Sequence, residues 1–286
     1  MNEREARAIL FSAIEGGHTF WAAEIYGSSA LEVINKLING GYDRIKYGAL
    51  IDYISLTSSD SILSSIDAAG STFLVPGDNF WPSRVEDLVT PPIALIGKGN
   101  LAVLTNDSLA IVGSRNPTNY GARIAGDFAA GFVDREWAVI SGGAYGIDTY
   151  AHKGALIAEG CTVAVIASGI DVNYPAGNTR LFEEICESGA LITEVMPGVK
   201  AMPHRFLTRN RLIAAMSLAT LVVEAAFRSG SLRTARDAAE LLRPVMAIPG
   251  PIHSPTSDGC HRLIGERAAE LVTSVADAVE FIGLNQ

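Results

Sequence analysis

The stretch Ala110-Ile-Val-Gly-Ser-Arg-Asn-Pro117 is an apolar run that breaks into small residues before a segment with helical periodicity. Val139-Ile-Ser-Gly-Gly-Ala-Tyr-Gly-Ile-Asp148 repeats this pattern. A strand, a tight turn and a helix N-terminus place several backbone N–H groups and the positive end of a helix dipole at one point, which makes a site for anions. Because the two turns occur in tandem and the first carries Arg115, they favour a surface that binds several phosphates over a site for a single nucleotide.

The alternation of strand and helix extends outward from these turns. Strand-like runs fall at 109–113, 137–141, 162–167, 190–193, 219–224 and 244–248, and helix-like segments at about 119–134, 146–159, 178–187, 206–217 and 231–242. This order predicts an α/β fold with a doubly wound, mostly parallel sheet and helices on both faces. Ligands of such sheets bind beyond the carboxyl ends of the strands. The glycine, serine and arginine residues that follow the strands are therefore expected at one rim.

The chain before this alternation divides into two parts. Residues 1–66 carry apolar residues at helical spacing, for example at 6–14 and 28–37, and predict a small all-helical accessory domain, similar to a SAM or helix-hairpin-helix module. Residues 67–108 are rich in proline and glycine and predict a connection packed on the next domain, ending in a short strand at 93–96. Residues 109–286 form the predicted α/β domain.

Composition argues against several classes of protein. The 286 residues are 48% hydrophobic and 19% charged, which is typical of a folded globular protein. Cys161, Cys186 and Cys260 are far apart with no CxxC pair, which argues against a zinc site or a disulfide framework and fits a reducing cytoplasm. We expect no signal peptide and no membrane span, because the N-terminus lacks a basic region and no apolar stretch reaches about 18 residues. No hydrolase motif or His/Cys cluster suggests a catalytic residue or a metal ligand.

The distribution of charge says more about partners than the total. The net charge of −9 by itself speaks against a nucleic-acid partner. Residues 1–110 hold 7 basic and 13 acidic side chains, whereas the segment 200–236 holds seven basic side chains against the single acidic Glu224. Six of those seven are arginines, and the planar guanidinium suits recognition of phosphate. This segment therefore favours a phosphate-rich partner over an ordinary solvated helix face.

Four elements at the predicted rim are candidate phosphate ligands. In Gly113-Ser114-Arg115 the glycine lets a ligand approach the backbone, the hydroxyl donates a hydrogen bond and the arginine supplies charge. The other three elements are Ser141-Gly142-Gly143-Ala144-Tyr145-Gly146, Arg209-Asn210-Arg211, and Ser229-Gly230-Ser231 with Thr234. In the last of these, small and hydroxyl residues open the helix after the strand at 219–224 and predict a further phosphate-binding turn.

Two features of the second turn have other interpretations. The turn 141–146 resembles a dinucleotide fingerprint, with Asp171 in the place of a ribose-binding carboxylate, so a nicotinamide or flavin enzyme stays open as an alternative. Asp148 and His152 lie four residues apart on one helix face, where they suggest a catalytic or metal pair. Support of the helix N-terminus by Asp148 and local packing of His152 is the simpler interpretation.

Taken together, these motifs resemble the DNA-processing protein A (Smf) family, the loaders of RecA in bacterial transformation. The resemblance runs from about Phe73 to Leu271 and consists of many motifs in one fixed order, which is more specific than any single motif. The segments are Trp81-Pro82, Pro91-Pro-Ile-Ala-Leu-Ile-Gly-Lys-Gly-Asn100, Ile111-Val-Gly-Ser-Arg-Asn-Pro117, Ser141-Gly-Gly-Ala-Tyr-Gly-Ile-Asp148, Ala151-His-Lys-Gly-Ala-Leu156, Tyr174-Pro175 with Asn178, Arg209-Asn-Arg211, Ser229-Gly-Ser-Leu-Arg-Thr-Ala235 and Ile248-Pro-Gly250.

The resemblance implies an extended Rossmann-like domain that binds single-stranded DNA without a nucleotide cofactor. It also implies a cytoplasmic homodimer that protects incoming DNA and delivers RecA to it in transformation and recombination, with no enzymatic activity. Gly113, Ser114 and Arg115 would then hold phosphates, and Arg209 and Arg211 would extend the same site. Its remaining lining would come from Ser141, Gly142, Gly143, Tyr145, Gly146, Tyr174, Pro175 and Asn178.

The sequence departs from the family pattern at three places. Tyr145 stands where the family usually has arginine, and an aromatic ring there can stack on a base. His261 stands where the family usually has asparagine. We expect no C-terminal winged-helix module, and hence no duplex recognition through one.

A second hypothesis comes from a different class of protein. Phosphoribohydrolases of a related fold, which process nucleotides, carry a Pro-Gly-Gly-x-Gly-Thr turn followed by a catalytic glutamate. Here the corresponding turn is Ser229-Gly-Ser-Leu-Arg-Thr234, and Glu240 lies well downstream of it. The hydrolase pattern is therefore not met.

Overall fold

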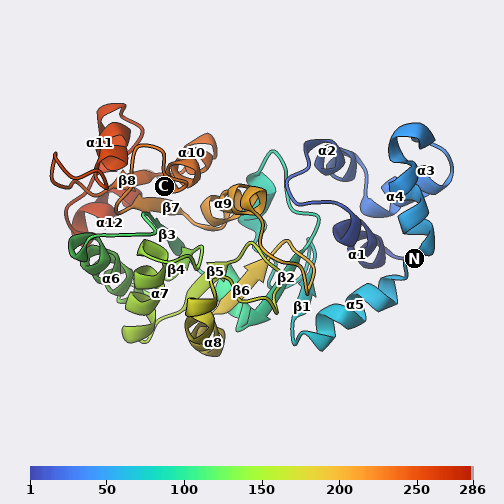
Figure 1. The fold of residues 1–286 in the computed structure, drawn as a ribbon, viewed down its shortest axis with the longest axis horizontal. Coiled ribbons are helices and arrows are strands. Elements are labelled where there is room, and N and C mark those ends of the chain that lie inside the picture. Colours follow the sequence, from blue (N-terminus) through green and yellow to red (C-terminus); the bar gives the residue numbers. More distant parts are fainter. Residues whose placement is uncertain (285–286) are drawn as a thin grey trace.

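The strands of residues 1–284, which the computed structural model describes, form one nine-stranded sheet in the order β1-β2-β6-β5-β4-β3-β7-β8-β9 (Figure 1). The neighbours from β6 to β9 run parallel, and β1 and β2 add an antiparallel edge. The sheet is therefore doubly wound and mostly parallel, as predicted. Its parallel strands are β3 (Ser108–Val112), β4 (Ala138–Ser141), β5 (Thr162–Val165), β6 (Ala190–Thr193), β7 (Ala219–Val222), β8 (Val245–Ala247) and β9 (Glu270–Leu271).

The central strands are buried along their whole length. Every residue of β3 to β8 is buried, because helices cover both faces of the sheet, and such strands read as continuous apolar runs. Successive side chains nevertheless alternate between two cores: Leu109 and Ile111 of β3 face one, and Ala110 and Val112 face the other. This explains why the sequence located these six strands to within two residues at either end.

Helices cover the two faces in separate groups (Figure 1). Phe128 and Ala151 from one group pack on Leu109 and Ile111, whereas Leu212 and Leu232 from the other pack on Val112. The first group is α6 (Asn119–Val133), α7 (Ile147–Ile157), α8 (Thr179–Ser188) and α12 (Val275–Gly283). The second is α9 (Pro203–Met216), α10 (Ser231–Glu240) and α11 (Asp258–Gly265). Not one helix within residues 1–284 has the length and apolar character needed to cross a membrane.

The order of the strands creates a switch point beside β3. From β3 the chain adds β4, β5 and β6 on one side, and then returns through α9 to add β7 and β8 on the other side. Connections from β3 and β7 therefore leave in opposite directions and open a crevice at their carboxyl ends. The turn Gly113-Ser114-Arg115 follows β3 at this point.

The segment 67–108 contributes strands to the sheet. β1 (Thr72–Leu74) pairs with β2 (Leu95–Gly99), and β2 pairs antiparallel with β6. The sequence placed a strand at 93–96, two residues early, and did not indicate β1 or β9. Strands of three and two residues are too short to show a period. Two 3₁₀ turns, Ser83–Asp87 and Leu101–Thr105, complete the segment.

The N-terminal residues form five helices, and two of them overlap the helical segments 6–14 and 28–37 that the sequence indicated. The five helices are α1 (Glu3–Ala13), α2 (Thr19–Gly27), α3 (Ala30–Ile38), α4 (Arg44–Leu56) and α5 (Ser59–Ala68). Apolar residues of α1 and α3, such as Phe11 and Ile34, share one core with Phe73 of β1 and Ile96 of β2. These helices thus pack directly on the antiparallel edge of the sheet.

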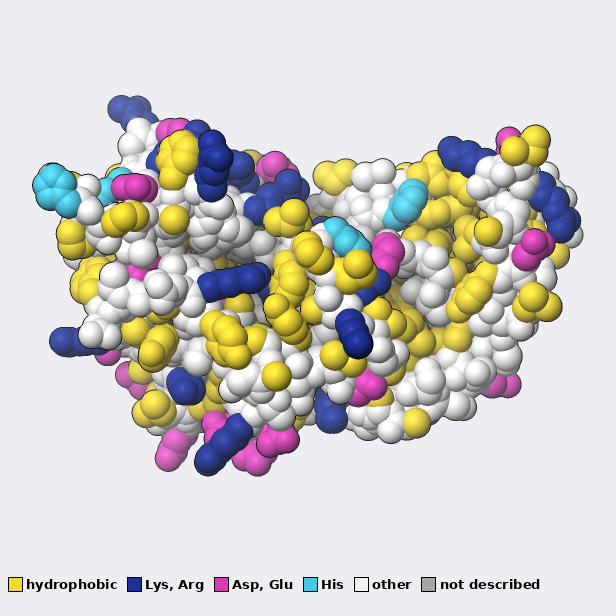
Figure 2. Space-filling view, in the orientation of Figure 1, with side chains coloured by type: hydrophobic (Ala, Val, Ile, Leu, Met, Phe, Trp, Pro, Cys, Tyr) yellow, Lys and Arg dark blue, Asp and Glu magenta, His cyan; other side chains and the backbone are white. Residues whose placement is uncertain are grey.

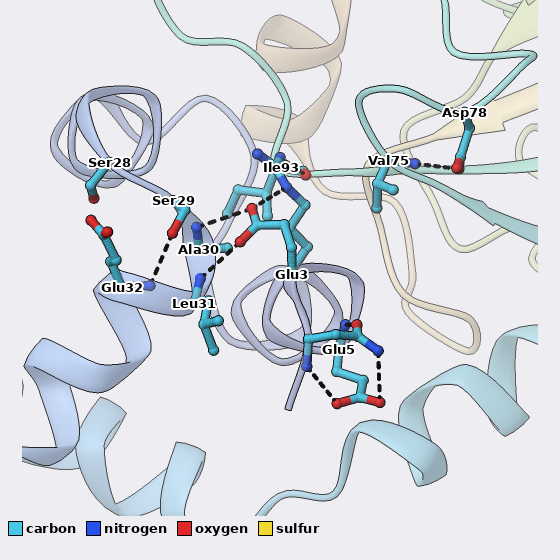
Figure 3. A network of polar contacts seen from close by, with 12 residues as sticks. Glu3, Glu5, Ser28, Ser29, Ala30, Leu31, Glu32, Val75, Asp78 and Ile93 are labelled. Carbon is cyan, nitrogen blue, oxygen red and sulfur yellow. Dashed lines mark hydrogen bonds and ion pairs between the residues drawn. The ribbon is translucent and has the colours of Figure 1, made fainter.

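Polar contacts of α1 fix this arrangement (Figure 3). The carboxylate of Glu3 accepts hydrogen bonds from the backbone N–H groups of Ala30 (3.1 Å) and Leu31 (3.0 Å), which open α3. Arg7, paired with Glu3, donates to the Ile93 carbonyl at 2.6 Å. One turn of α1 therefore links α3 to the chain that enters β2.

Candidate functional site

A cavity of about 310 Å³ lies at the switch point, between the carboxyl ends of β3 and β7. Its walls come from the turn after β3, the N-terminal part of α7, the outer turns of α9 and the start of α10. Eight residues predicted from the sequence line it: Gly113, Arg115, Arg209, Asn210, Ser229, Gly230, Ser231 and Thr234. Val112, Ala144, Asp148, Phe206, Leu207 and Ile213 complete the lining.

The two glycine-rich turns of the sequence pack directly on each other at this cavity. The backbone N–H of Ile147 donates to the Ser114 carbonyl at 3.0 Å, and the N–H of Ser114 donates to the Glu224 carbonyl at 2.7 Å. Gly146 has φ of +85°, and a Cβ there would lie 2.6 Å from the Arg115 carbonyl carbon. The close approach of the turns therefore requires glycine at 146.

Arg115 is exposed and lies over an aromatic ring. Its guanidinium carbon is 5.1 Å from the centre of the Phe206 ring, and the Tyr174 ring centre is 5.5 Å from that of Phe206. The exposed fraction of Tyr174 is 49%. A cation over an aromatic face is attracted to it, and the two rings leave a flat apolar surface beside the charge. Figure 2 shows basic and hydrophobic side chains side by side over α9 on this face.

Phe206 was not among the residues singled out from the sequence. The available signal was an aromatic residue within the arginine-rich segment 200–236, three positions before Arg209. Interleaved cations and aromatics are the composition of surfaces that bind single-stranded nucleic acid. The charges of this segment predict phosphate binding, and the ring of Phe206 adds the signal for bases that the prediction lacked.

The start of α10 supplies hydroxyl groups to the cavity. The Ser229 and Ser231 Oγ atoms are 2.7 Å apart, and the Ser231 N–H donates to Ser229 Oγ at 3.3 Å. The Asn210 side-chain amide donates to the Gly230 carbonyl at 3.2 Å, which ties this loop to α9. The positive end of the dipole of this ten-residue helix favours an anion here.

Arg209 is buried beneath the second turn. Its Nη1 donates to the carbonyls of Gly142 (2.6 Å) and Val165. The Asp148 carboxylate accepts from the N–H groups of Gly142 (3.2 Å) and Ala144 (3.3 Å). Burial lowers the pKa of Arg209 to about 10, against the opposing effect of Asp148, so the guanidinium stays charged at neutral pH. Arg209 and Asp148 thus hold the turn from below.

Arg211 lies outside the cavity and is paired. Its Nη2 lies 2.6 Å and 2.7 Å from the two carboxylate oxygens of Glu194, and both side chains are buried. A Cβ on Gly17 would lie 3.3 Å from Arg211 Nε, so the loop between α1 and α2 covers this pair. The guanidinium of Arg211, which the sequence predicted to bind phosphate, is therefore already bound by the Glu194 carboxylate.

The remaining predicted residues divide into a buried and an exposed group. Ser141 is buried, and its hydroxyl donates to the Ile111 carbonyl at 2.6 Å. Asn178 is buried and donates to the Gly143 carbonyl at 3.0 Å, while Pro175 is buried after a cis Tyr174–Pro175 peptide bond. Tyr145 is half exposed, and its hydroxyl accepts from the Gly177 N–H at 3.2 Å. Tyr145 and Tyr174 thus present their rings to solvent.

The residues that the alternative hypotheses single out either make structural contacts or lie outside the cavity. Asp171 accepts from the Gly198 N–H at 2.7 Å. His152 is buried with Nδ1 2.7 Å from Thr162 Oγ1, and burial lowers its pKa to about 3. Glu240 is exposed at the end of α10 and is not in the cavity wall. In residues 1–284 no three His, Cys, Asp or Glu side chains are grouped as metal ligands.

Comparison with known proteins places these features in a family. The family model described as DNA recombination-mediator protein A matches residues 72–283. A putative DNA processing protein DprA from Mycobacterium tuberculosis is 46% identical over 227 residues, which are 75% of this chain and 58% of that protein. DprA from Streptococcus pneumoniae is 42% identical over 202 residues, 71% of each chain. The chain thus spans little more than half the length of its mycobacterial relative.

Solved structures agree with the sequence matches. The X-ray structure of Streptococcus pneumoniae DprA superposes with a TM-score of 0.85 at 31% identity, over 98% of both chains. DNA processing protein A from Helicobacter pylori, whose structure is described for its single-stranded DNA binding mode, gives a TM-score of 0.67 at 27% identity. That match covers 75% of this chain and 94% of the Helicobacter protein.

Proposed function

The chain belongs to the DNA recombination-mediator protein A family, and from this premise we propose that it binds single-stranded DNA at the cavity between β3 and β7. One observation carries the proposal. The exposed guanidinium of Arg115 lies over the Phe206 ring at the edge of a cavity that also receives the start of α10. Charge for phosphate and flat rings for bases thus lie side by side.

The phosphate contacts come from two directions. Arg115 supplies the exposed positive charge, and the start of α10 supplies the hydroxyls of Ser229 and Ser231 and the positive end of its helix dipole. Both groups line the same cavity, so successive phosphates of one strand can reach them. Binding through phosphate contacts releases counterions and weakens as salt rises.

The base contacts come from aromatic rings that are exposed or half-buried. Phe206 and Tyr174 lie next to each other, and Tyr145 is held nearby through Gly177. Aromatic rings stack on any base, which favours a single strand with exposed bases over a duplex. Stacking of this kind carries little sequence preference.

The buried residues position the site. Arg209 and Asp148 hold the turn at 142–144, and Asn178 ties that turn to the loop before α8. Arg211 is neutralised by Glu194. We assign direct contacts to Gly113, Ser114, Arg115, Tyr145, Tyr174, Ser229, Gly230 and Ser231, and a positioning role to the buried set.

A salt titration tests this proposal. Fluorescence anisotropy with a labelled oligothymidylate should show affinity falling steeply as salt rises. Arg115→Ala should weaken binding about tenfold and reduce the salt slope by roughly one phosphate contact. Arg123→Ala removes an exposed arginine of α6 and is the matched control. If affinity is indifferent to salt and to Arg115→Ala, the proposal is wrong.

The finer roles follow from the family. We propose that the protein protects single-stranded DNA and delivers RecA to it during transformation and recombination, acting as a homodimer and without a nucleotide cofactor. The three cysteines are free, which fits a reducing cytoplasm. Strand exchange by RecA on DNA coated with a single-strand binding protein tests delivery, and light scattering tests the dimer.

The hydrolase hypothesis has no comparable observation in its favour. Within the described chain, Asp148 is the one carboxylate that lines the cavity, and two backbone N–H groups already bond to it. Release of base from a nucleoside monophosphate would favour the hydrolase. We therefore propose a binding protein and assign no catalytic residue.

A further inference from the structure

A cluster of aromatic rings lies in the N-terminal helices, away from the cavity. Phe20 and Tyr47 stack with ring centres 5.7 Å apart and an angle of 10° between their planes. Trp21 lies edge-on to both, at 4.8 Å from Phe20 and 5.2 Å from Tyr47. The ammonium of Lys46 lies 5.0 Å from the Tyr47 ring centre and 5.8 Å from that of Phe20.

The outer half of this cluster is open to solvent. Trp21 is buried, but Phe20 is 37% exposed and Tyr47 is partly exposed. Lys46 is exposed and makes no ion pair within residues 1–284. A buried ring that supports two stacked, accessible rings beneath a free cation is a platform on which a base can stack beside its phosphate.

The platform continues the proposed DNA site across α9. A Cβ on Gly17 would lie 2.8 Å from the Thr208 side chain, so the loop before α2 touches the outer turns of α9. Arg205 pairs with Glu15 of the same loop, and His204 lies 3.8 Å from that carboxylate. Phe206 is therefore on the helix that this loop contacts. Figure 2 shows histidine and hydrophobic side chains following one another from α9 toward α2.

The separation suits a strand of a few nucleotides. Phe20 is three residues from Gly17, so the two Cα atoms are at most about 11 Å apart. Sites that combine a basic groove with stacking rings follow a single strand over several nucleotides. One strand that begins at Arg115 and Phe206 can therefore reach Phe20.

We propose that Phe20, Tyr47 and Lys46 form a second stacking subsite, which binds the same single strand after it leaves the cavity. The inference rests on the proposed function, because it extends the path of the strand assigned there. The N-terminal helices thereby take part in binding single-stranded DNA.

Charge around the platform defines the character of the subsite. Arg44 pairs with Asp52, so these two charges cancel, whereas Glu24 accepts a hydrogen bond from the neutral Tyr42 phenol and keeps a negative charge that offsets Lys46. Glu15 is held by Arg205. Lys46 is the cation that lies over the rings, so base stacking contributes more to binding at this subsite than the attraction of phosphate. The contribution of this subsite to affinity should therefore depend little on salt.

Two oligothymidylates of different length test the subsite. One of about six nucleotides should fill the cavity alone, and one of about twenty should reach both places. Phe20→Leu should weaken binding of the longer oligonucleotide about tenfold and leave the shorter unchanged. Lys46→Ala should weaken the longer about threefold. Ile45→Ala, at the neighbouring residue with a 97% exposed side chain, is the matched control.

Photo-crosslinking locates the strand independently of affinity. Oligonucleotides with 5-iododeoxyuridine crosslink to aromatic side chains, and mass spectrometry of the wild-type protein should find peptides with Phe20 or Tyr47 for the longer probe only. Thermal melting of Phe20→Leu by circular dichroism separates a lost contact from a lost fold.

The outcomes separate the two proposals. If Arg115→Ala weakens both lengths while Phe20→Leu weakens neither and no crosslink forms in α2 or α4, the subsite is absent and the proposed function stands. If Arg115→Ala affects neither length, the proposed function fails and the subsite fails with it. Crosslinks at Phe20 or Tyr47 together with the loss in Phe20→Leu support both.

Discussion

The mouth of the cavity and the layer beneath it use the same residue types for different purposes. At the mouth, Arg115 is exposed over Phe206 and makes no ion pair with the described residues. Beneath it, Arg209 donates to two backbone carbonyls, and Arg211 is neutralised by Glu194. Burial and prior pairing, rather than residue type, therefore separate a ligand contact from a support.

This difference gives the two layers separable effects. Substitutions in the buried layer should change the free energy of unfolding, because they leave polar groups without partners in a low-dielectric interior. Substitutions at the mouth should change DNA affinity and leave unfolding nearly unaltered.

The largest expected effect comes from breaking the buried ion pair. Arg211→Ala leaves the buried Glu194 carboxylate without its partner, which should lower the free energy of unfolding by about 3–5 kcal/mol. Urea denaturation measures the loss. The double variant Arg211→Met/Glu194→Leu removes both charges and should recover most of the stability. A loss below about 1 kcal/mol in the single variant would mean that the pair is not a support.

Gly146 lies between the two layers, so its substitution should change both the free energy of unfolding and the affinity for DNA. Gly146→Ala places a Cβ near the Arg115 backbone at positive φ, which should cost about 1–3 kcal/mol and displace the turn at 113–115. DNA affinity should fall with it. Gly40→Ala is the control, because Gly40 has φ of +80° but open space around it. Equal effects of both variants on DNA binding would contradict the contact between the turns.

The buried His152 predicts a pH dependence of stability. The Thr162 hydroxyl donates its proton to the Val139 carbonyl. The bond between His152 and Thr162 therefore uses the proton on Nδ1, which donates to Thr162 Oγ1. Burial lowers the pKa of His152 to about 3, whereas the unfolded value is about 6.5. Below pH 6.5 the unfolded chain therefore binds the extra proton, and stability falls toward pH 3.

Between pH 6.5 and pH 5 this loss should reach about 2 kcal/mol. Urea denaturation at the two values measures it in the wild type and in His152→Asn, which cannot gain the proton. The difference between the two proteins isolates this histidine from the carboxylates. Parallel loss in both would show that His152 does not titrate as its burial requires.

The smallest expected effect tests the mouth alone. Arg115→Lys keeps the positive charge but loses the planar group over Phe206. Affinity for single-stranded DNA should fall by about 0.5–1 kcal/mol, with the salt slope and the unfolding transition unchanged. Anisotropy titrations at several salt concentrations measure both affinity and slope. A changed slope with unchanged affinity would mean that charge alone matters at this position.

Much of the fold was predictable because its signals are local. The six central strands are apolar runs, as strands buried on both faces must be, and glycine follows β3 and β4 where the turns are tight. The first residues of α9 were missed, although Pro203 at its first turn is a helix-start signal. The helix α2 was missed because its nine residues carry little one-sided periodicity.

The candidate site was predictable only in part. Sequence order placed Gly113, Arg115 and Ser229 after strands, and in the structure all three line one cavity. The pattern gave no means of separating Arg115 from Arg211, since both are arginines next to an asparagine. The position of Phe206 beneath the Arg115 guanidinium identifies it as a site residue, whereas its place in the arginine-rich segment 200–236 was a weaker signal in the sequence.

The sequence by itself determined the order of strands and helices along the chain, the tight turns, and the edge of the sheet at which these turns meet. Hydrophobic period, glycine and proline act on neighbouring residues, so these features need no distant partner. Tertiary structure alone decided which arginine faces solvent. Arg209 contacts the carbonyl of Val165 at the end of β5, and Arg211 contacts Glu194 just after β6, so distant parts of the chain bury each guanidinium. Arg115 contacts an aromatic ring and stays exposed.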